Sequence, residues 1–239
     1  MSNQAVYYGR LSVDIYSIGM NIPTLYDFPL YHRTHMEFIK DENNPELLAR
    51  YKKVSAYGLE IEHKMRGLEK FEVLPDSLWA GFNNEYEYPQ DDEYVFEIKG
   101  GCIIMRERCA NIFKQFRLGE STLTPLQIYD INTGKLWSDE IFYFFNFCEK
   151  RHYLAKSQSK GILAFIPHPM SQFEDGTYAE QGGVRDGVVE VDATASNCDI
   201  DIWNDPRLVG SVFMSEPLRN ALKEQNMTIG WALRSCALV

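Results

Sequence analysis

The chain carries an almost wholly apolar segment, Ile141-Phe142-Tyr143-Phe144-Phe145-Asn146-Phe147, dominated by aromatic residues that favour β-strands. A continuous apolar run of this length is typical of a strand buried on both faces, because a half-exposed strand alternates apolar and polar residues. Before it stand a β-prone run, Leu123–Ile131, and the turn residues Asn132-Thr133-Gly134-Lys135. These features predict an antiparallel hairpin whose second arm is a central strand.

Helices are predicted on both sides of this hairpin. In Ile104–Phe116 the apolar residues recur on one helical face, and Gly119 follows as a stop signal. Glu216–Gln225 is preceded by Ser215, which is suited to the N-cap position. With two further segments that begin near Pro45 and Gly58, the predicted helices are Asn44–Lys53, Gly58–Arg66, Ile104–Phe116 and Glu216–Gln225.

Short strand-like runs fill much of the remaining chain, while the rest of residues 1–40 reads as loops and extended pieces. These runs are Ala5–Tyr8, Tyr94–Ile98, Gly161–Ile166, Val188–Val191, Val212–Met214 and Ile229–Leu233. Because strands and helices do not alternate regularly, we predict an α+β fold with a largely antiparallel sheet and a few packed helices. The 239 residues fit one unit of two lobes or two small domains, with an N-terminal α+β part at 1–70 and a C-terminal α+β part at 71–239.

The chain is acidic, with 24 Lys and Arg against 34 Asp and Glu and a formal net charge of −10. A field of this sign repels phosphate, so we expect neither general nucleic-acid binding nor docking on an anionic membrane. It attracts a basic protein partner and accelerates the encounter. Acidity also serves solubility alone, so charge by itself does not identify a partner.

The cysteines and the N-terminus indicate a reducing compartment. The five cysteines are far apart, form no C-x-x-C pair and lie among apolar or aromatic neighbours, which predicts reduced core thiols. The N-terminus has no basic segment followed by an apolar one, and no apolar run approaches the length of a membrane span. We therefore expect a cytoplasmic protein.

No motif in the sequence assembles a reaction centre. His32 and His35 have metal-ligand spacing, but no carboxylate follows at zincin spacing and the neighbouring residues do not indicate a helix. The glycines of Gly176–Gly187 precede a strand, whereas a dinucleotide loop precedes a helix. No cysteine directly neighbours a histidine in the sequence, and the nearest pair is Cys148 and His152, four residues apart. We therefore predict no catalytic residue, no cofactor and no metal.

Two acidic segments are candidates for partner binding. The first is the loop 85–93, which combines carboxylates that steer a basic partner with tyrosines that offer rigid contact area. The second is an edge at 199–205, where acidic and apolar residues alternate as in a strand with one solvated polar face. The candidate residues are Glu85, Tyr86, Glu87, Tyr88, Asp91, Asp92 and Glu93 in the loop, and Asp199, Asp201 and Asp205 at the edge.

The order of several short motifs resembles a known family. Asp201–Leu222 runs from Trp203-Asn204-Asp205-Pro206-Arg207 through an apolar strand to Ser215-Glu216-Pro217-Leu218. Earlier, the helix at 104–116 leads to the exit Phe116-Arg117-Leu118-Gly119-Glu120, a Thr-Pro-Leu strand and an aromatic-rich strand. Together these segments, over about residues 70–239, resemble a family of bacterial immunity proteins for polymorphic toxins, first catalogued as a domain of unknown function.

This resemblance implies an immunity-like domain that binds a cognate toxin delivered by type VI or contact-dependent secretion. The family shares no catalytic residue set and its toxin-binding surfaces vary, so no functional residue is carried over. Because we expect a cytoplasmic protein, we expect a toxin that acts there, such as a nuclease or a nucleotide-modifying enzyme.

We therefore predict a non-enzymatic immunity protein that neutralises a toxin effector with a basic surface by direct protein–protein contact. The loop 85–93 is the first candidate interface and the edge 199–205 the second. Two alternatives stay open, together with the oligomeric state and the choice between active-site occlusion and allosteric inhibition. One is a small hydrolase-type enzyme in which His168 or Cys148 meets a distant carboxylate, and the other is a structural or self-assembling protein.

Overall fold

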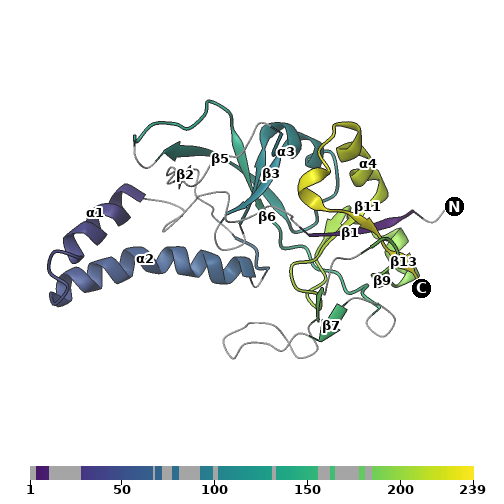
Figure 1. The fold of residues 1–239 in the computed structure, drawn as a ribbon, viewed down its shortest axis with the longest axis horizontal. Coiled ribbons are helices and arrows are strands. Elements are labelled where there is room, and N and C mark those ends of the chain that lie inside the picture. Colours follow the sequence, from purple (N-terminus) through teal and green to yellow (C-terminus); the bar gives the residue numbers. More distant parts are fainter. Residues whose placement is uncertain are drawn as a thin grey trace.

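The computed structural model describes residues 4–10, 28–66, 68–71, 77–80, 92–98, 102–130, 133–155, 162–164, 178–180 and 185–239. Within these ranges the fold is α+β, with mostly antiparallel sheets and packed helices, as predicted (Figure 1). None of the helices in these ranges has both the length and the apolar character that crossing a bilayer requires.

A five-stranded sheet is built around the apolar segment at 141–147. Its strand order is β2 (Ser77–Ala80), β5 (Thr122–Asp130), β6 (Phe142–Asn146), β4 (Cys102–Arg106) and β3 (Val95–Ile98). β6 is the middle strand, all five of its residues are buried, and it pairs antiparallel with β4 and β5. The predicted hairpin and its central strand are therefore confirmed. β2 joins the edge by parallel pairing with β5.

A second, four-stranded sheet has the order β10 (Ile202–Trp203), β11 (Val212–Ser215), β1 (Val6–Gly9) and β12 (Arg234–Ser235). β1 pairs antiparallel with β11 and β12, so residues 6–9 belong with the C-terminal part of the chain. The division into parts 1–70 and 71–239 therefore does not hold for the first strand. Two smaller ladders join β13 (Ala237–Leu238) to β9 (Glu190–Val191) and β7 (Ile162–Ala164) to β8 (Tyr178–Glu180).

The four-stranded sheet lies between two hydrophobic clusters because neighbouring residues of a strand point to opposite faces. Met214 belongs to a cluster that also contains Phe145 of the five-stranded sheet, while Phe213 belongs to a cluster with Tyr8. The first cluster is closed by α3 (Glu107–Phe113), α4 (Glu216–Glu224) and the 3-10 helix η2 (Ile229–Trp231). A further 3-10 helix, η1 (Ala193–Asn197), carries Ala195 of the second cluster.

Two predicted elements near the C-terminus have different outcomes. Ser215 is the N-cap of α4, and its hydroxyl accepts the N–H of Leu218 at 3.4 Å, as predicted. The predicted strand Ile229–Leu233 is wrong, because η2 occupies its first residues and Ala232 has a positive φ of 43°. That left-handed residue turns the chain so that β12 and β13 form after it.

The predicted helix at 104–116 is too long at both ends, because α3 ends at Phe113. Cys102–Arg106 is strand β4, and α3 begins only at Glu107. Ile104 and Met105 are both fully buried, which suits a strand covered on both faces and not a helix with one apolar stripe. The helical spacing therefore holds only from Cys109 onward.

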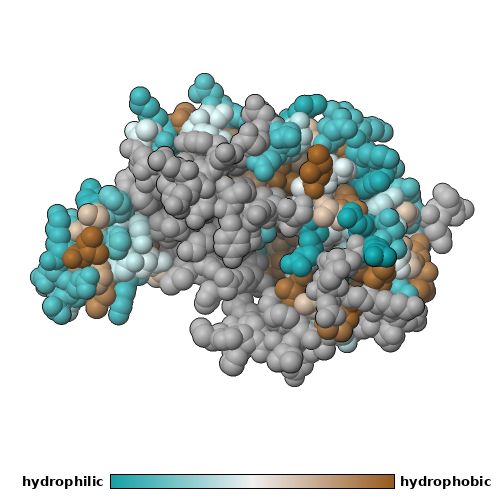
Figure 2. All heavy atoms as spheres, in the orientation of Figure 1, coloured by the Kyte–Doolittle hydropathy of each residue, from teal (hydrophilic) through white to brown (hydrophobic). Residues whose placement is uncertain are grey.

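Helix α1 (Phe28–Phe38) replaces the loop predicted before residue 40, and α2 (Pro45–Arg66) is one helix where two were predicted. They form a hairpin that projects from the sheets (Figure 1). Phe38 stacks on Tyr51 with ring centroids 5.2 Å apart, so aromatic contacts between the helices override the weak local signal. Figure 2 shows hydrophobic residues among hydrophilic ones on this hairpin, where Met36 and Ile39 are exposed.

Candidate functional site

The acidic loop 85–93 enters the described structure only at its C-terminal end. Glu85, Tyr86, Glu87, Tyr88 and Asp91 lie outside the described residues. Asp92 is exposed and Glu93 is half-buried, and both directly precede Tyr94 and β3. The structure therefore shows where this loop joins the five-stranded sheet.

Arg106, at the end of β4, fixes that junction. Its backbone N–H donates to the carbonyl of Tyr94 at 3.0 Å, and its Nε donates to the carbonyl of Glu93 at 3.2 Å. The residue is only 7% exposed, and its guanidinium carbon lies 5.8 Å from the ring centre of Trp137 and 5.6 Å from that of Phe142. An ion pair with Glu140 balances its charge. The base of the acidic loop is thus held by a buried cation.

The segment between β5 and β6 reaches the same guanidinium. Gly134 turns the chain with a φ of +69°, and the N–H of Trp137 then donates to the carbonyl of Ile128 at 2.8 Å. Trp137 stacks on Phe142 with ring centroids 5.1 Å apart. Glu140 and the carbonyl of Glu93 both bond to Arg106, so this side chain links residues 136–141 to the segment that precedes β3. We call residues 136–141 the β5–β6 connection.

The β5–β6 connection adds groups that sequence reasoning did not select. Asp139 is exposed, and the side chains of Leu136 and Ile141 are large, apolar and 38% and 42% exposed. Lys135 is an exposed cation at the turn that precedes them. One signal in the sequence could have pointed to these groups. Arg106 is a single cation after an apolar run, and a cation buried in this way requires a partner of opposite charge.

The interpretation of 199–205 as a solvated edge is wrong for two of its three aspartates. Asp201 is 6% exposed, accepts the N–H of Arg117 at 2.9 Å and accepts the hydroxyl of Ser215 at 2.8 Å. Asp205 is fully buried and accepts from the backbone of Leu154 and from Arg207. These carboxylates cap backbone and side-chain donors, so they hold the fold and present no surface to a partner.

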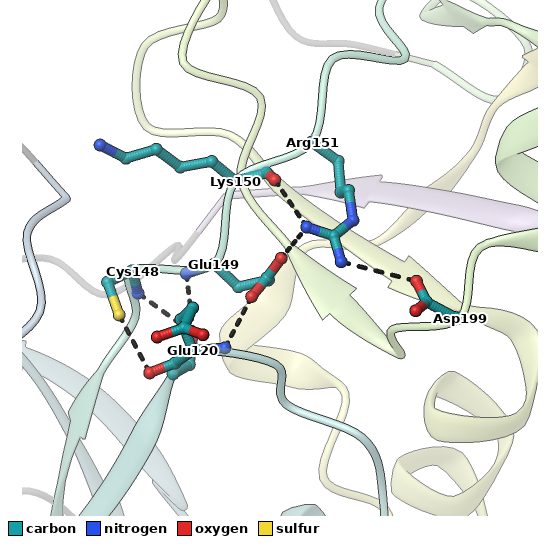
Figure 3. Close-up of polar contacts among 7 residues, drawn as sticks. Glu120, Cys148, Glu149, Lys150, Arg151 and Asp199 are labelled. Carbon is teal, nitrogen blue, oxygen red and sulfur yellow. Dashed lines mark hydrogen bonds and ion pairs between the residues drawn. The ribbon is translucent and has the colours of Figure 1, made fainter.

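Asp199 is the exposed member of that edge, with 77% of its side chain accessible. It lies 3.5 Å from a guanidinium nitrogen of Arg151, which also pairs with Glu149 (Figure 3). Glu149 is 3% exposed, and its Oε2 accepts the N–H of Glu120 at 2.6 Å. This chain of contacts fastens the turn after α3 to the segment after β6, and Asp199 is its solvent-facing end.

Cys148, one of the two residues named for the enzyme alternative, lies in the same region (Figure 3). Its Sγ donates to the carbonyl of Glu120 at 3.2 Å, and burial raises the pKa of its thiol despite the opposing charge of Lys70. Burial likewise raises the pKa of Cys109 to about 12. Both thiols are therefore neutral at physiological pH, and a neutral thiol is a poor nucleophile. His168, the other candidate of that alternative, lies outside the described residues.

The histidines of the H-x-x-H pair lie on α1, and His35 packs as an aromatic side chain. Its ring stacks on Tyr31 and on Tyr51, with centroids 5.8 Å and 5.3 Å apart. Over the ranges that the structure describes, no three His, Cys, Asp or Glu residues are grouped as metal ligands. Here His35 stabilises the helical hairpin.

Comparison with known proteins assigns neither a family nor a function to this chain. Neither protein-family models nor curated proteins match this chain. We therefore infer function from the motif order, the charge and the described surface.

Proposed function

We propose that this protein is a cytoplasmic immunity protein that binds a cognate secreted toxin by direct contact and neutralises it inside the producing cell. The toxin is expected to present a basic surface, because the chain carries a net charge of −10. Occupation of the toxin's active site, or of a surface that controls it, would account for protection.

The proposal is carried by the contrast between two sets of carboxylates. Glu149, Asp201 and Asp205 are buried and bonded within the fold. Asp92 and Asp139 are exposed, and they lie on segments that Arg106 holds in place. Exposed charges on a rigid base steer a partner and lose little conformational entropy when it binds.

Local structure supports the C-terminal part of the family resemblance. Residues 201–222 form β10, β11 and the Ser215-capped helix α4 in the order of the motif. The resembled pattern leads from this helix to a final strand, and here η2 lies between α4 and the last strands, β12 and β13. The Asp205–Arg207 contact gives the Trp-Asn-Asp-Pro-Arg motif a structural role. Such a role fits a family whose shared motifs specify the fold while its binding surfaces vary.

Binding is favoured over the hydrolase alternative by the chemistry of Cys148. A cysteine nucleophile needs a lowered pKa, supplied by a nearby histidine, cation or helix N-terminus. The pKa of the Cys148 thiol is raised, and its proton is directed at a backbone carbonyl. This arrangement suits a structural thiol.

The test is co-expression with the product of the neighbouring gene. If that product is the cognate toxin, its expression alone stops growth, and expression with this chain restores growth and yields a co-purifying complex. A matched control is the Asp205→Asn variant, whose fold is weakened away from the exposed carboxylates and whose protection should fall with its folded fraction. Failure of the folded native chain to restore growth or to co-purify contradicts the proposal, as does turnover of a substrate by the isolated chain.

A further inference from the structure

Strand β7 is the outer strand of a small ladder, in which it pairs antiparallel with β8. On the other side of β8, the N–H of Tyr178 donates to the carbonyl of Arg207 at 2.8 Å, and the carbonyl of Tyr178 accepts the N–H of Val209 at 2.9 Å. β8 is therefore bonded on both sides. Among the described residues, β7 has a neighbouring strand on one side only.

This pairing fixes the direction of the backbone groups of β7. Along an antiparallel strand, the N–H and C=O of one residue point to one side, and those of the next residue point to the other side. Because Tyr178 directs both of its groups away from β7, the hydrogen-bonded pair between β7 and β8 is Leu163 with Ala179. The backbone groups of Ile162 and Ala164 therefore point away from β8, and no other segment in the described ranges bonds to them.

β7 is anchored in the core and exposes one large side chain. Ile162 is 7% exposed and belongs to the hydrophobic cluster of Tyr8 and Phe213. The side chain of Leu163 points to the opposite face, because neighbouring residues of a strand alternate, and it is 52% exposed. Neither a charged residue nor a proline, which commonly protect an edge strand, occurs in β7. Such an edge is suited to pairing with a further strand.

The edge of β7 is complementary to itself. When two copies meet antiparallel about a two-fold axis, with Leu163 opposite the partner subunit's Leu163, Ile162 lies opposite the partner subunit's Ala164. Both of these residues direct an N–H and a C=O outward, so each pair exchanges both of its N–H···O bonds. The leucines then form a non-hydrogen-bonded pair, in which opposite side chains lie closest and cover each other. A shift by one residue would place Ile162 opposite the partner subunit's Leu163, whose backbone groups already bond to β8.

We propose that β7 is a self-association edge, at which two copies of this chain pair in that register and join their ladders into one sheet. The contact uses three residues of each copy, far fewer than a standard protein interface. The dimer therefore forms at protein concentrations on the order of 0.1 mM and dissociates at micromolar concentrations. Self-association needs no other protein, so it is independent of the immunity function.

The register is tested by disulfide cross-linking of the full chain. Leu163→Cys places two thiols in a non-hydrogen-bonded pair, where the Cα separation of about 4.5 Å lies within the range of a disulfide. Ile229→Cys is the control, because Ile229 is 77% exposed and random collision would cross-link it more readily. Under mild oxidation, Leu163→Cys should form a covalent dimer several times faster than Ile229→Cys and than the native chain with its own cysteines. Equal or slower cross-linking of Leu163→Cys overturns the proposal.

Sedimentation equilibrium up to about 0.5 mM protein tests the contact without an added thiol. Ala164→Pro removes an outward N–H and leaves the bonds of Leu163 to β8 in place, and proline is tolerated at such an edge position. Leu163→Ser keeps the backbone and removes the apolar contact. The native chain should gain mass with concentration, and each variant should associate at least about tenfold more weakly. Ile229→Ser, which removes a more exposed aliphatic side chain elsewhere, should associate as the native chain does.

Three further outcomes would overturn the proposal. A native chain that stays monomeric up to about 0.5 mM does not self-associate at β7. Association that persists in both Leu163→Ser and Ala164→Pro, with thermal unfolding to verify the fold, places the contact elsewhere on the chain. If the native chain is monomeric and Ala164→Pro stops co-purification of the neighbouring-gene product, the edge pairs with an extended segment of another protein instead of a second copy.

Discussion

Asp205 and Arg207 form a two-point ion pair, with Nε of Arg207 2.8 Å from Oδ1 and Nη2 2.6 Å from Oδ2 of the carboxylate. The Oδ2 atom also accepts the N–H of Leu154 at 2.9 Å, so one buried side chain joins segments far apart in the sequence. Paired oxygen and nitrogen contacts of this kind are the strongest geometry of an arginine–carboxylate pair. The acidic residue that the sequence offered for partner binding is instead part of the framework.

Replacing Asp205 should destabilise the folded protein. We expect Asp205→Asn to lower the free energy of unfolding by about 3 kcal/mol, because Arg207 loses its counter-charge in a largely buried site. Asp199→Asn, only six residues away but 77% exposed, should change it by less than about 0.5 kcal/mol. Urea denaturation followed by tryptophan fluorescence measures both values. Similar small losses for the two variants would show that Asp205 is not a structural residue.

Gly119 is predicted to be irreplaceable for two separable reasons. Its φ is +61°, and a Cβ would lie 2.0 Å from Oε2 of Glu149, whose side chain is tied to Arg151 and to the N–H of Glu120. Gly119→Ala should therefore destabilise the protein by at least about 2 kcal/mol more than the backbone strain alone.

Gly134→Ala is the matched control for that prediction. Gly134 has a φ of +69°, and a Cβ added there would have no atom within 4 Å, so its substitution should cost only the strain of a left-handed residue, about 1 kcal/mol. Thermal and urea unfolding of both variants give the difference. If Gly119→Ala costs no more than Gly134→Ala, the close approach of Glu149 is not important for stability.

The sequence predicted best where hydrophobicity alone decides the structure. The run at 141–147 has a single polar residue, Asn146, which is typical of a strand covered on both sides, and residues 142–146 form the middle strand β6. The prediction of a helix was wrong at Ile104 and Met105. There a strand buried on both faces is followed directly by a short helix, and the apolar residues of the two together have the spacing of one longer helix. Helix α1 was missed because its stability comes from contacts of its aromatic residues with α2.

Candidate binding residues were harder to predict, because a carboxylate looks the same in the sequence whether it faces water or a buried donor. Asp199, Asp201 and Asp205 have similar spacing, yet the structure exposes the first and buries the other two. Their donors, such as the N–H of Arg117, come from distant segments that no local pattern reveals. Similarly, the role of Arg106 depends on the pairing of β3 with β4.

Glu97 should make stability depend on pH. It is half-buried on β3, and desolvation raises its pKa despite the opposing effect of Arg10. A raised folded-state pKa means that the folded state binds the proton more tightly than the unfolded state does, so stability is lost as pH rises through the two values. We expect Glu97→Gln to raise the free energy of unfolding at neutral pH and to have no effect below about pH 3, where the carboxyl group is protonated in both states.

The measurement for Glu97 is urea denaturation of the native chain and the variant, at neutral pH and at the acidic pH where the carboxyl group is protonated in both states. Glu42→Gln, at an exposed residue, controls for the loss of one charge. Equal effects of the two substitutions at neutral pH would show that burial of Glu97 does not matter.

The acidic loop makes a kinetic prediction for the complex with the neighbouring-gene product. Reversing Asp91, Asp92 and Glu93 to lysine should slow association by about tenfold or more at low salt, because long-range attraction of a basic partner is lost. The dissociation rate should change much less, and the difference in association rate should shrink as salt screens the charges. Stopped-flow association at several salt concentrations, with thermal unfolding to verify the fold, gives these values.

A second triple reversal separates the loop from net charge. Asp41, Glu42 and Glu46 lie on the helical hairpin, and their reversal to lysine changes the net charge by the same amount. If the loop steers the partner locally, this control should slow association far less than the reversal at 91–93. Equal slowing would assign the effect to overall charge, and unchanged association in the loop variant would remove residues 91–93 from the binding surface, since a charge that guides encounter cannot be reversed without a change in rate.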